Sequence, residues 1–192
     1  MKTTACAVIV ETRDLPGIEG IIAAQDKFLP SWFEETRWIK NEPINSMRDY
    51  NNLLTSKRFW RVMPDKVVII QHDSMILREG IEEFLEWDFC GAPIPKIGWP
   101  CMNGGFSIRD TKAMLKVINH LPYQGMQVSG NEDIFLCNAL RDLGGKLPTY
   151  EIAEKFSVET RYALGSIGYH QISAYLTPSE CRAIENQYNQ LI

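Results

Sequence analysis

The sequence has no long hydrophobic run, no large excess of charge of one sign, and no repeated or low-complexity segment. Without about 20 consecutive apolar residues, no membrane-spanning helix is expected. The apolar stretch near the amino terminus is short and charged residues follow it directly, so it predicts a first strand rather than a signal peptide. A formal net charge of -4 provides no strong global attraction to nucleic acid or to an anionic membrane.

Cysteine is also sparse, and its arrangement excludes two kinds of structure. The five cysteines are widely spaced, odd in number and never form a C-x-x-C pair: Cys6, Cys90, Cys101, Cys137 and Cys181. This pattern argues against a structural zinc site and against a disulfide framework. We therefore expect a reducing compartment and a cytoplasmic protein.

What the sequence does contain is an alternation of strand and helix patterns, which is typical of a sheet flanked by helices. By residue number, we expect a strand within 1–10, helices over 18–28 and 46–59, a strand over 67–71, a short helix near 79–85, a strand near 88–91, a loop over 92–105, a strand over 106–109, and helices beginning after 110, near 129 and after 177. These elements predict one α/β domain over residues 1–192, with a mixed, mostly parallel sheet.

The stretch from Lys66 to Ser74, KVVIIQHDS, is the most informative part of the chain. A continuous apolar run of β-branched residues predicts a buried central strand. The strand ends at Asp73, which places a carboxylate at the carboxyl edge of the sheet, where open α/β folds bind ligands. The alternative is that Asp73 only shapes a turn or caps a helix.

Four polar or glycine-rich clusters follow apolar elements: QHDS at 71–74, NGGFSIRD at 103–110, GNEDIF at 130–135 and GYHQ at 168–171. In this order they resemble the motif series of GT-A-type nucleotide-sugar glycosyltransferases. The runs NNLLTSKRFW, VVIIQHDSMILREGIEEFLEWDFCGAPI and FSVE more closely resemble a small, poorly characterised family of GT-A-like glycosyltransferases. The resemblance covers about residues 50–170 and implies a single GT-A domain that binds a nucleotide-sugar.

The resemblance implies a divalent cation, Mg²⁺ or Mn²⁺, held by Asp73 and His170 on the diphosphate of the donor. In the family pattern the metal motif is Asp-x-Asp, whereas this chain has Gln71, His72 and Asp73. The missing carboxylate predicts weak metal affinity without the donor and leaves metal-independent transfer open. His72 is expected to point to the opposite face of the strand from Asp73.

The x-Glu-Asp element implies a catalytic base, with Glu132 and Asp133 as the candidates. Ser129 and Glu132 have the spacing of a capping box, which would engage Glu132 at the start of a helix. We therefore choose Asp133 as the base that deprotonates an acceptor hydroxyl in a single inverting displacement. A retaining reaction stays open, because the sequence fixes no stereochemistry.

Further residues are expected to bind the donor because they follow strands or match the family motifs. Arg48 and Arg109 are phosphate candidates, with solvated helix-face arginine as the alternative for Arg48. Trp99 could stack on a sugar or fill the core. The full set of predicted nucleotide-sugar contacts is Thr12, Arg13, Arg48, Asn52, Gln71, His72, Asp73, Ser74, Asn103, Gly104, Gly105 and Arg109.

The predicted function is transfer of a sugar, from a UDP-sugar in the first instance, to an acceptor hydroxyl. The acceptor could be a carbohydrate, a small molecule or a modified DNA base, the last reached through the basic residues Lys57, Arg58 and Arg61. Two other classes stay open: a non-catalytic module that binds a nucleotide-sugar or a glycan, and a metal-dependent phosphohydrolase or nucleotidyltransferase. The latter would call for more clustered carboxylates than the sequence contains.

Overall fold

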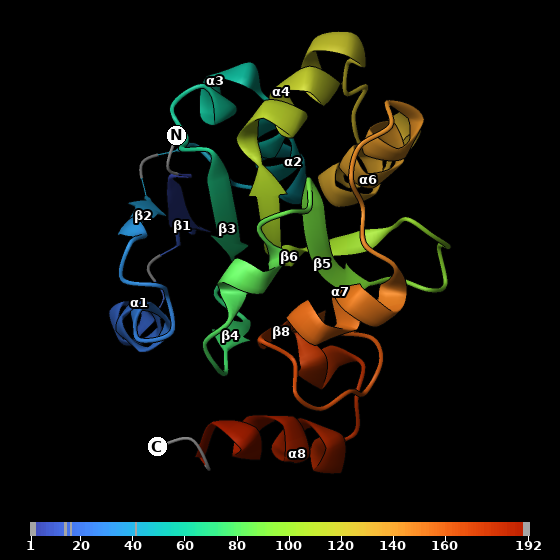
Figure 1. Ribbon diagram of the computed structural model, residues 1–192. Coiled ribbons are helices and arrows are strands. Elements are labelled where there is room, and N and C mark those ends of the chain that lie inside the picture. The colour runs from blue at the N-terminus through green and yellow to red at the C-terminus, as the bar shows by residue number, and fades with distance from the viewer. Residues whose placement is uncertain (1–2, 14, 16, 41, 190–192) are drawn as a thin grey trace.

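A five-stranded sheet of order β2-β1-β3-β6-β5 forms the centre of the molecule (Figure 1). The computed structural model describes residues 3–13, 15, 17–40 and 42–189. The strands are β1 (Ala5–Val10), β2 (Glu34–Ile39), β3 (Lys66–Ile70), β5 (Phe89–Pro93) and β6 (Met102–Asp110). β1 is parallel to β2 and β3, and β6 is antiparallel to β3 and β5, so only β6 runs against the others. The prediction of a mixed, mostly parallel sheet is confirmed.

Helices flank this sheet, and several begin at the residues that the sequence indicates. Asp110 accepts a hydrogen bond from the N–H of Ala113 (2.8 Å) and so caps α4. The single helix predicted over 46–59 is wrong: the first helix ends at Leu54, and Ser56 caps a new one by accepting from the N–H of Phe59 (3.2 Å). The helices are α1 (Ile18–Asp26), α2 (Met47–Leu54), α3 (Lys57–Trp60), α4 (Thr111–His120), α5 (Met126–Ser129), α6 (Glu132–Asp142), α7 (Tyr150–Phe156) and α8 (Pro178–Asn189), with 3-10 turns at Ile81–Phe84 and Ile172–Ala174.

A second, small sheet was not expected from the sequence. It consists of β4 (Ser74–Ile76), β8 (Gly168–His170) and β7 (Ser157–Val158), in the order β4-β8-β7. In Figure 1 it lies below the carboxyl end of β3, with α8 beyond it. Antiparallel pairing sets Ser74 opposite His170. The small sheet therefore brings the last predicted motif to the edge where the first one ends.

The loop predicted over 92–105 is shorter than expected, because β6 already begins at Met102. A bulge between Gly91 and Pro93 lets β5 pair with this early part of β6. Asn103, Gly104 and Gly105 consequently lie in a strand whose amino end meets the carboxyl edge of its neighbours. Strand β2 was not predicted at all, because its sequence EETRWI carries three charged residues.

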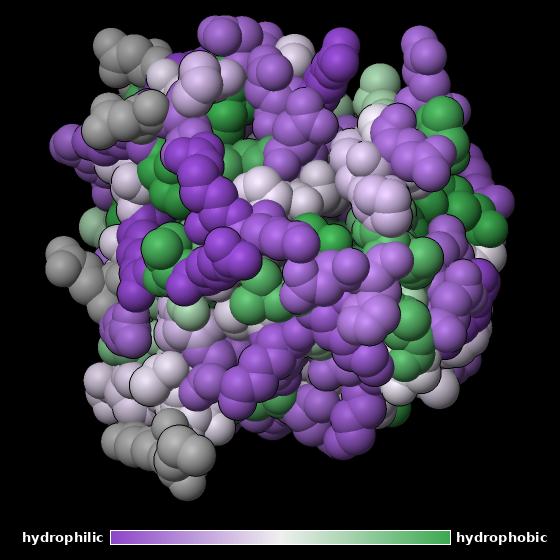
Figure 2. Space-filling model, turned by 90° about the horizontal axis from the view of Figure 1, so that it is seen from above, coloured by the Kyte–Doolittle hydropathy of each residue, from purple (hydrophilic) through white to green (hydrophobic). Residues whose placement is uncertain are grey.

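The basic residues proposed as a route to DNA lie away from that edge. Lys57 and Arg58 on α3 and the following Arg61 are exposed, and they precede the amino end of β3. The polar turn follows the carboxyl end of the same strand. At about 3.3 Å per residue, the five residues of β3 separate the two ends of the strand by about 16 Å. Figure 2 shows the end of the molecule that carries α3 and α4 as mostly hydrophilic, with scattered apolar residues. Among the residues described, no helix is long and apolar enough to cross a bilayer.

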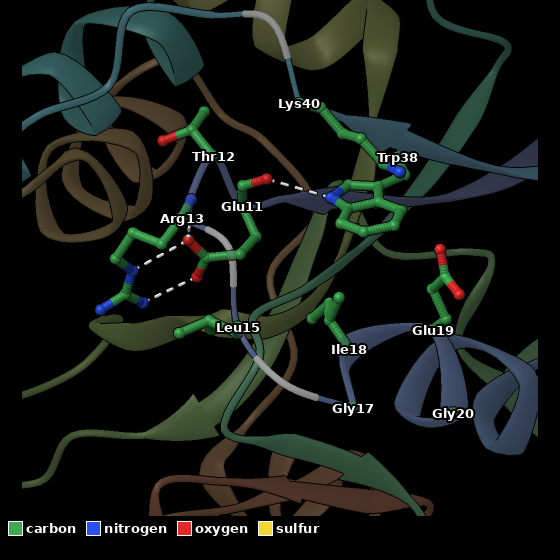
Figure 3. Close-up of a pocket in the computed structure, with 10 residues that line it drawn as sticks. All are labelled: Glu11, Thr12, Arg13, Leu15, Gly17, Ile18, Glu19, Gly20, Trp38 and Lys40. Carbon is green, nitrogen blue, oxygen red and sulfur yellow. Dashed lines mark hydrogen bonds and ion pairs between the residues drawn. The ribbon is translucent and has the colours of Figure 1, made fainter.

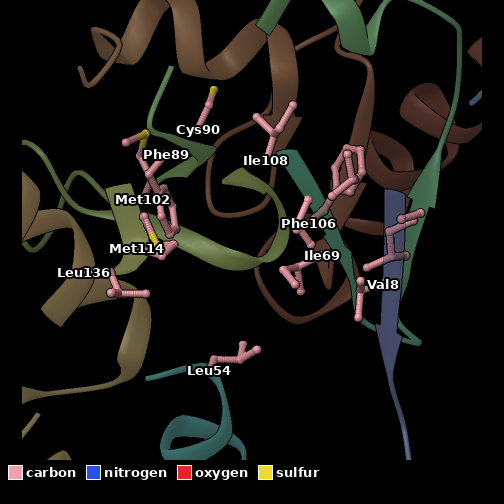
Figure 4. Packing of buried hydrophobic residues seen from close by; sticks show 14 of the residues in the cluster. Val8, Leu54, Ile69, Phe89, Cys90, Met102, Phe106, Ile108, Met114 and Leu136 are labelled. Carbon is pink, nitrogen blue, oxygen red and sulfur yellow. The ribbon is translucent and has the colours of Figure 1, made fainter. Parts of the chain in front are cut away.

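The interior is a continuous apolar core around the main sheet (Figure 4). Every residue of β1 and β3 is buried, as expected for central strands covered on both faces. Burial of each large aliphatic or aromatic side chain contributes roughly 1.5–3 kcal/mol. The labelled members in Figure 4 are Val8, Leu54, Ile69, Phe89, Cys90, Met102, Phe106, Ile108, Met114 and Leu136. This rigid centre holds the polar edge described next.

Candidate functional site

The polar edge begins in the turn that follows β3. The N–H of Ser74 donates to the carbonyl of Gln71 (3.0 Å), and the N–H of Gln71 donates to the carbonyl of Gly105 on β6 (2.8 Å). The buried hydroxyl of Ser74 donates to the same Gly105 carbonyl (3.1 Å). Ser74 thus fixes the turn to β6, and its hydroxyl is occupied by the backbone rather than open to a ligand.

His72 and Asp73 leave this turn in different directions, as their positions on a strand end predict. His72 Nδ1 lies 3.2 Å from Glu11 Oε2, beside the carboxyl end of β1. Asp73 Oδ1 lies 3.2 Å from Nε2 of His170 on β8. The structure therefore brings together the two residues predicted to hold a cation, while His72 pairs with Glu11.

His170 is the centre of a buried polar cluster. Its Nε2 lies 2.9 Å from Oε1 of Gln71, and its Nδ1 donates to Oε1 of Glu159 at 3.0 Å. Burial acts to lower the pKa of His170, but the hydrogen bonds and charges of Asp73 and Glu159 outweigh it and raise that pKa to about 9. Burial raises the pKa of Asp73, yet His170 and the charge of His72 bring it below its ordinary value. Asp73 is therefore ionised at neutral pH.

The donor atoms around His170 Nε2 fit a divalent cation. Two ligands that are each about 2.1 Å from an ion, at right angles, lie about 3.0 Å apart. Nε2 is 2.9 Å from Gln71 Oε1 and 3.2 Å from Asp73 Oδ1, which matches that spacing. These are also hydrogen-bond distances, because a pKa of about 9 leaves Nε2 protonated without a metal, so a cation would have to displace that proton. Within the described ranges, no three His, Cys, Asp or Glu side chains are placed to hold a metal ion together. A cation here would need the amide oxygen of Gln71 and oxygen atoms from water or a ligand.

A cavity of about 600 Å³ lies at the carboxyl ends of β1 and β2 (Figure 3). Trp38 forms one wall, fixed by a hydrogen bond from its Nε1 to the carbonyl of Glu11 (3.0 Å). The ammonium group of Lys40 lies 3.3 Å from the centre of the Trp38 ring. Arg13 donates to both oxygens of the buried Glu11 carboxylate (2.9 and 2.7 Å), and this bonding lowers the pKa of Glu11. The cavity thus combines an aromatic wall with two cations, Arg13 and Lys40, and two carboxylates, Glu11 and Glu19.

The donor contacts predicted after β1 line this cavity, and those predicted on α2 do not. Thr12 and Arg13 line this cavity, although the Thr12 hydroxyl donates to the carbonyl of Ile44 (2.9 Å). Arg48 and Asn52 are exposed on α2 and are not among the residues that line the cavity. A smaller hollow of about 220 Å³ on the other side of the turn is lined by His72, Asp73, Ser74, Met75, Tyr169, Gln171, Ile172, Ser173 and Glu185.

The two carboxylates at the start of α6 have different partners. Glu132 is buried and makes two bonds to the Arg109 guanidinium, at 2.9 and 3.0 Å. Asp133 accepts from the N–H of Gly104 (3.0 Å) and from the N–H of Ile134 (2.8 Å). Burial, with the nearby charge of Glu132, raises the pKa of Asp133 to about 7. A pKa near 7 is in the range of a general base, but Asp133 is buried and lines neither of these two cavities.

These contacts correct two predictions. Glu132 does not complete a capping box, because its carboxylate is bonded to Arg109; the Ser129 hydroxyl instead accepts from the N–H of Gln124 (3.1 Å). Arg109 is fully buried and is also bonded to Ser107 and to the carbonyl of Gly104, so no phosphate can reach it without displacing Glu132. A buried pair of this kind serves the packing of α6 on β6.

The glycine pair on β6 makes room for both groups of polar residues. A Cβ at Gly105 would lie 2.3 Å from the His170 ring. A Cβ at Gly104 would lie 2.4 Å from the Arg109 guanidinium and 2.7 Å from Glu132. Consecutive strand residues face opposite sides. The predicted importance of the pair therefore has a steric reason, with one glycine for each face.

Several polar residues of the site were not predicted. Glu11 and Glu159 are buried acids next to predicted residues, yet nothing in their local sequence distinguishes them from surface acids. Tyr50 is buried on α2 with its hydroxyl near Gln71 and Asp133, without a hydrogen bond of normal geometry. Glu159 lies in the FSVE run of the family resemblance, but that run alone does not indicate a role for its carboxylate.

Comparison with known proteins supports the fold. The structure is similar to the apo-form glycosyltransferase GlyE of Streptococcus pneumoniae TIGR4, with a TM-score of 0.56 and 11% identity over 92% of this chain and 55% of that one. The chain therefore spans about half the length of GlyE. A197 from STIV is similar at a TM-score of 0.43 and 11% identity, over 70% of this chain and 77% of A197.

Sequence comparison gives the family. None of the curated proteins matches the sequence. The profile of the family described as "Protein of unknown function (DUF5672)" matches residues 34–172, which includes the turn after β3, the glycine pair, the start of α6 and His170. Since the match covers most of the chain, this protein belongs to the DUF5672 family.

Proposed function

We propose that this protein transfers a sugar from a nucleotide-sugar, with a UDP-sugar as the first donor to test, to the hydroxyl group of an acceptor. The observation that carries the proposal is the meeting of Gln71, Asp73 and His170 beside the cavity at the carboxyl ends of β1 and β2. Open α/β sheets bind nucleotides at this edge. The similarity of the fold to a glycosyltransferase is consistent with this use of the edge.

The cavity provides the groups that a nucleotide needs. Trp38 offers a flat face on which a base can stack, and Arg13 and Lys40 supply positive charge for phosphates. Glu11 keeps Arg13 in place through two hydrogen bonds. The diphosphate would then lie over the turn at 71–73, between the cavity and His170.

Asp73 and His170, with the amide oxygen of Gln71, would hold Mg²⁺ or Mn²⁺. Such an ion offsets the negative charge that develops on the departing diphosphate. Asp133 would accept the proton of the acceptor hydroxyl, because its pKa of about 7 leaves a large fraction of it ionised near neutral pH. A single displacement with this base inverts the anomeric centre, so the configuration of the product tests the assignment directly.

A thermal-shift screen of nucleotide-sugars with and without Mn²⁺ tests the proposal. A donor at 100 times its Kd stabilises the folded state by about 2.7 kcal/mol. For a chain of this size that corresponds to a rise in Tm of about 5 to 10 °C. Absence of a shift with every nucleotide would contradict the proposal.

Two variants separate the role of the cation from general effects. Asp73→Asn keeps the side-chain shape and removes the charge, so we expect it to lose the part of the shift that depends on Mn²⁺. Asp142→Asn is the matched control, because Asp142 is a surface residue at the far end of α6 that pairs with Arg141. It should respond to donor and Mn²⁺ like the wild type.

A further inference from the structure

Glu159 is a buried carboxylate that the proposed chemistry leaves without a role. Its side chain is 4% exposed, and in the part of the chain that the structure describes its only ion pair is with His170 at 3.0 Å. No lysine or arginine of that part pairs with it. A buried carboxylate costs several kcal/mol unless it is paired and hydrogen-bonded. The groups that bond to the Glu159 carboxylate therefore indicate its role.

Both donors to Glu159 come from the candidate site. His170 Nδ1 and Asn103 Nδ2 each lie 3.0 Å from the same oxygen, Oε1. Asn103 Oδ1 in turn accepts from the N–H of Gly105 (2.6 Å). A chain of hydrogen bonds thus connects the backbone of β6 to the His170 ring, which packs over Gly105 where a Cβ would collide with it.

This arrangement fixes which ring nitrogen faces the turn after β3. With the Nδ1 proton engaged by Glu159, Nε2 is directed to Gln71 and Asp73. Histidines that bind metals generally donate their other N–H to a carboxylate, a carbonyl or water, which orients the ring and makes the ligand more basic. Glu159 is such a carboxylate, since its Oε1 accepts the hydrogen bond from Nδ1 of His170.

We infer that Glu159 is a positioning residue: it holds the Nδ1 proton of His170 and so presents Nε2 to the divalent cation shared with Asp73. The inference rests on the cation site of the proposed function. Loss of such a partner typically weakens metal affinity by about 10- to 100-fold. Glu159 itself contacts neither cation nor substrate, so its effect must pass through His170.

Mn²⁺ titration followed by electron paramagnetic resonance, with UDP present, measures this effect without any turnover. We expect Glu159→Leu to weaken Mn²⁺ binding about 10- to 100-fold, and the exposed Glu79→Leu to leave it unchanged. In a His170→Ala background, Glu159→Leu should cause no further loss. Wild-type affinity in Glu159→Leu, or an equal loss in both backgrounds, would overturn the inference.

Nuclear magnetic resonance of the ¹⁵N-labelled protein without metal gives a second readout. We expect a hydrogen-bonded Nδ1–H proton of His170 that disappears in His170→Ala and is lost or strongly shifted in Glu159→Leu. If the wild type binds no Mn²⁺ but this Nδ1 proton responds to Glu159→Leu, the proposed cation site is wrong while the positioning by Glu159 stands. An Nδ1 proton unaffected by Glu159→Leu would refute the positioning.

Glu159→Gln provides the same test if the leucine variant does not fold. The glutamine keeps the shape of the side chain and one acceptor oxygen, but it removes the charge. We expect weaker Mn²⁺ binding than in the wild type when His170 is present, and no difference in the His170→Ala background. Equal binding in the presence of His170 would overturn the inference.

Discussion

Substitution of Asp133 by asparagine should change how the stability of the protein depends on pH. Burial and the charge of Glu132 raise the pKa of Asp133 from 3.8 to about 7. An acid whose pKa is raised by folding binds its proton more tightly in the folded state, so its contribution to the unfolding free energy falls as the pH rises from about 4 to about 7. Asparagine does not titrate, so the variant lacks this contribution.

The magnitude follows from the size of the shift. Three pKa units at about 1.4 kcal/mol each correspond to roughly 4 kcal/mol over the whole range. About 2 to 3 kcal/mol of this falls between pH 5 and pH 8. Asparagine also places an amide NH₂ group opposite the N–H of Gly104 or of Ile134, but that loss is the same at every pH. The difference between the two proteins should therefore change with pH by about 2 to 3 kcal/mol, in favour of the variant at high pH.

Urea unfolding at pH 5, 6, 7 and 8 measures this difference. Wild type and Asp133→Asn are compared at each pH, with Asp142→Asn as a surface control whose offset from the wild type should stay constant. The slope of the unfolding free energy with urea should be similar in all three proteins, which shows that the same surface is exposed. A difference between wild type and Asp133→Asn that does not vary with pH would refute the reasoning about the buried carboxylate.

Three further predictions concern activity and binding. The rate of sugar transfer should increase as the pH rises through about 7, because Asp133 must be ionised to accept a proton. A transfer rate independent of pH from 5 to 8 would exclude Asp133 as the catalytic base. Gly105→Ala places a Cβ 2.3 Å from the His170 ring and should abolish the Mn²⁺-dependent thermal shift, whereas the surface control Asp142→Asn should not. Trp38→Ala should weaken nucleotide binding by roughly 5- to 150-fold, as expected for loss of one stacked nucleobase. Calorimetric titration with UDP would measure this change. An unchanged affinity for UDP would mean that the nucleobase does not stack on Trp38.

Elements with strong local signals could be predicted from the sequence. The apolar run of β3 and the polar residues after it were found because a buried strand and its end are both visible in a few adjacent residues. The starts of α4 and α8 were predicted for the same reason, and the structure has a cap at each: Asp110 accepts from the N–H of Ala113, and Thr177 and Glu180 each accept from the other's backbone N–H.

Contacts between distant segments could not be predicted in the same way. Glu132 has the spacing of a capping residue, but the cation of Arg109, 23 positions away, is the stronger partner for its charge. Asn103 and Gly104 look like a loop because glycine is frequent in turns, but they lie in β6, which begins at Met102. The role inferred for Glu159 depends on its contact with His170, which the small sheet brings beside it.

Because consecutive residues of a strand face opposite sides, the glycine pair of β6 separates two groups of polar residues. One face of this backbone borders the ring that would bind the cation, and the other face borders the carboxylate that would take the proton. Sequence changes at Gly105 should therefore alter metal chemistry without altering proton transfer, and changes at Gly104 should do the reverse. Within the family, cation binding could then change through position 105 and proton transfer through position 104, independently of each other.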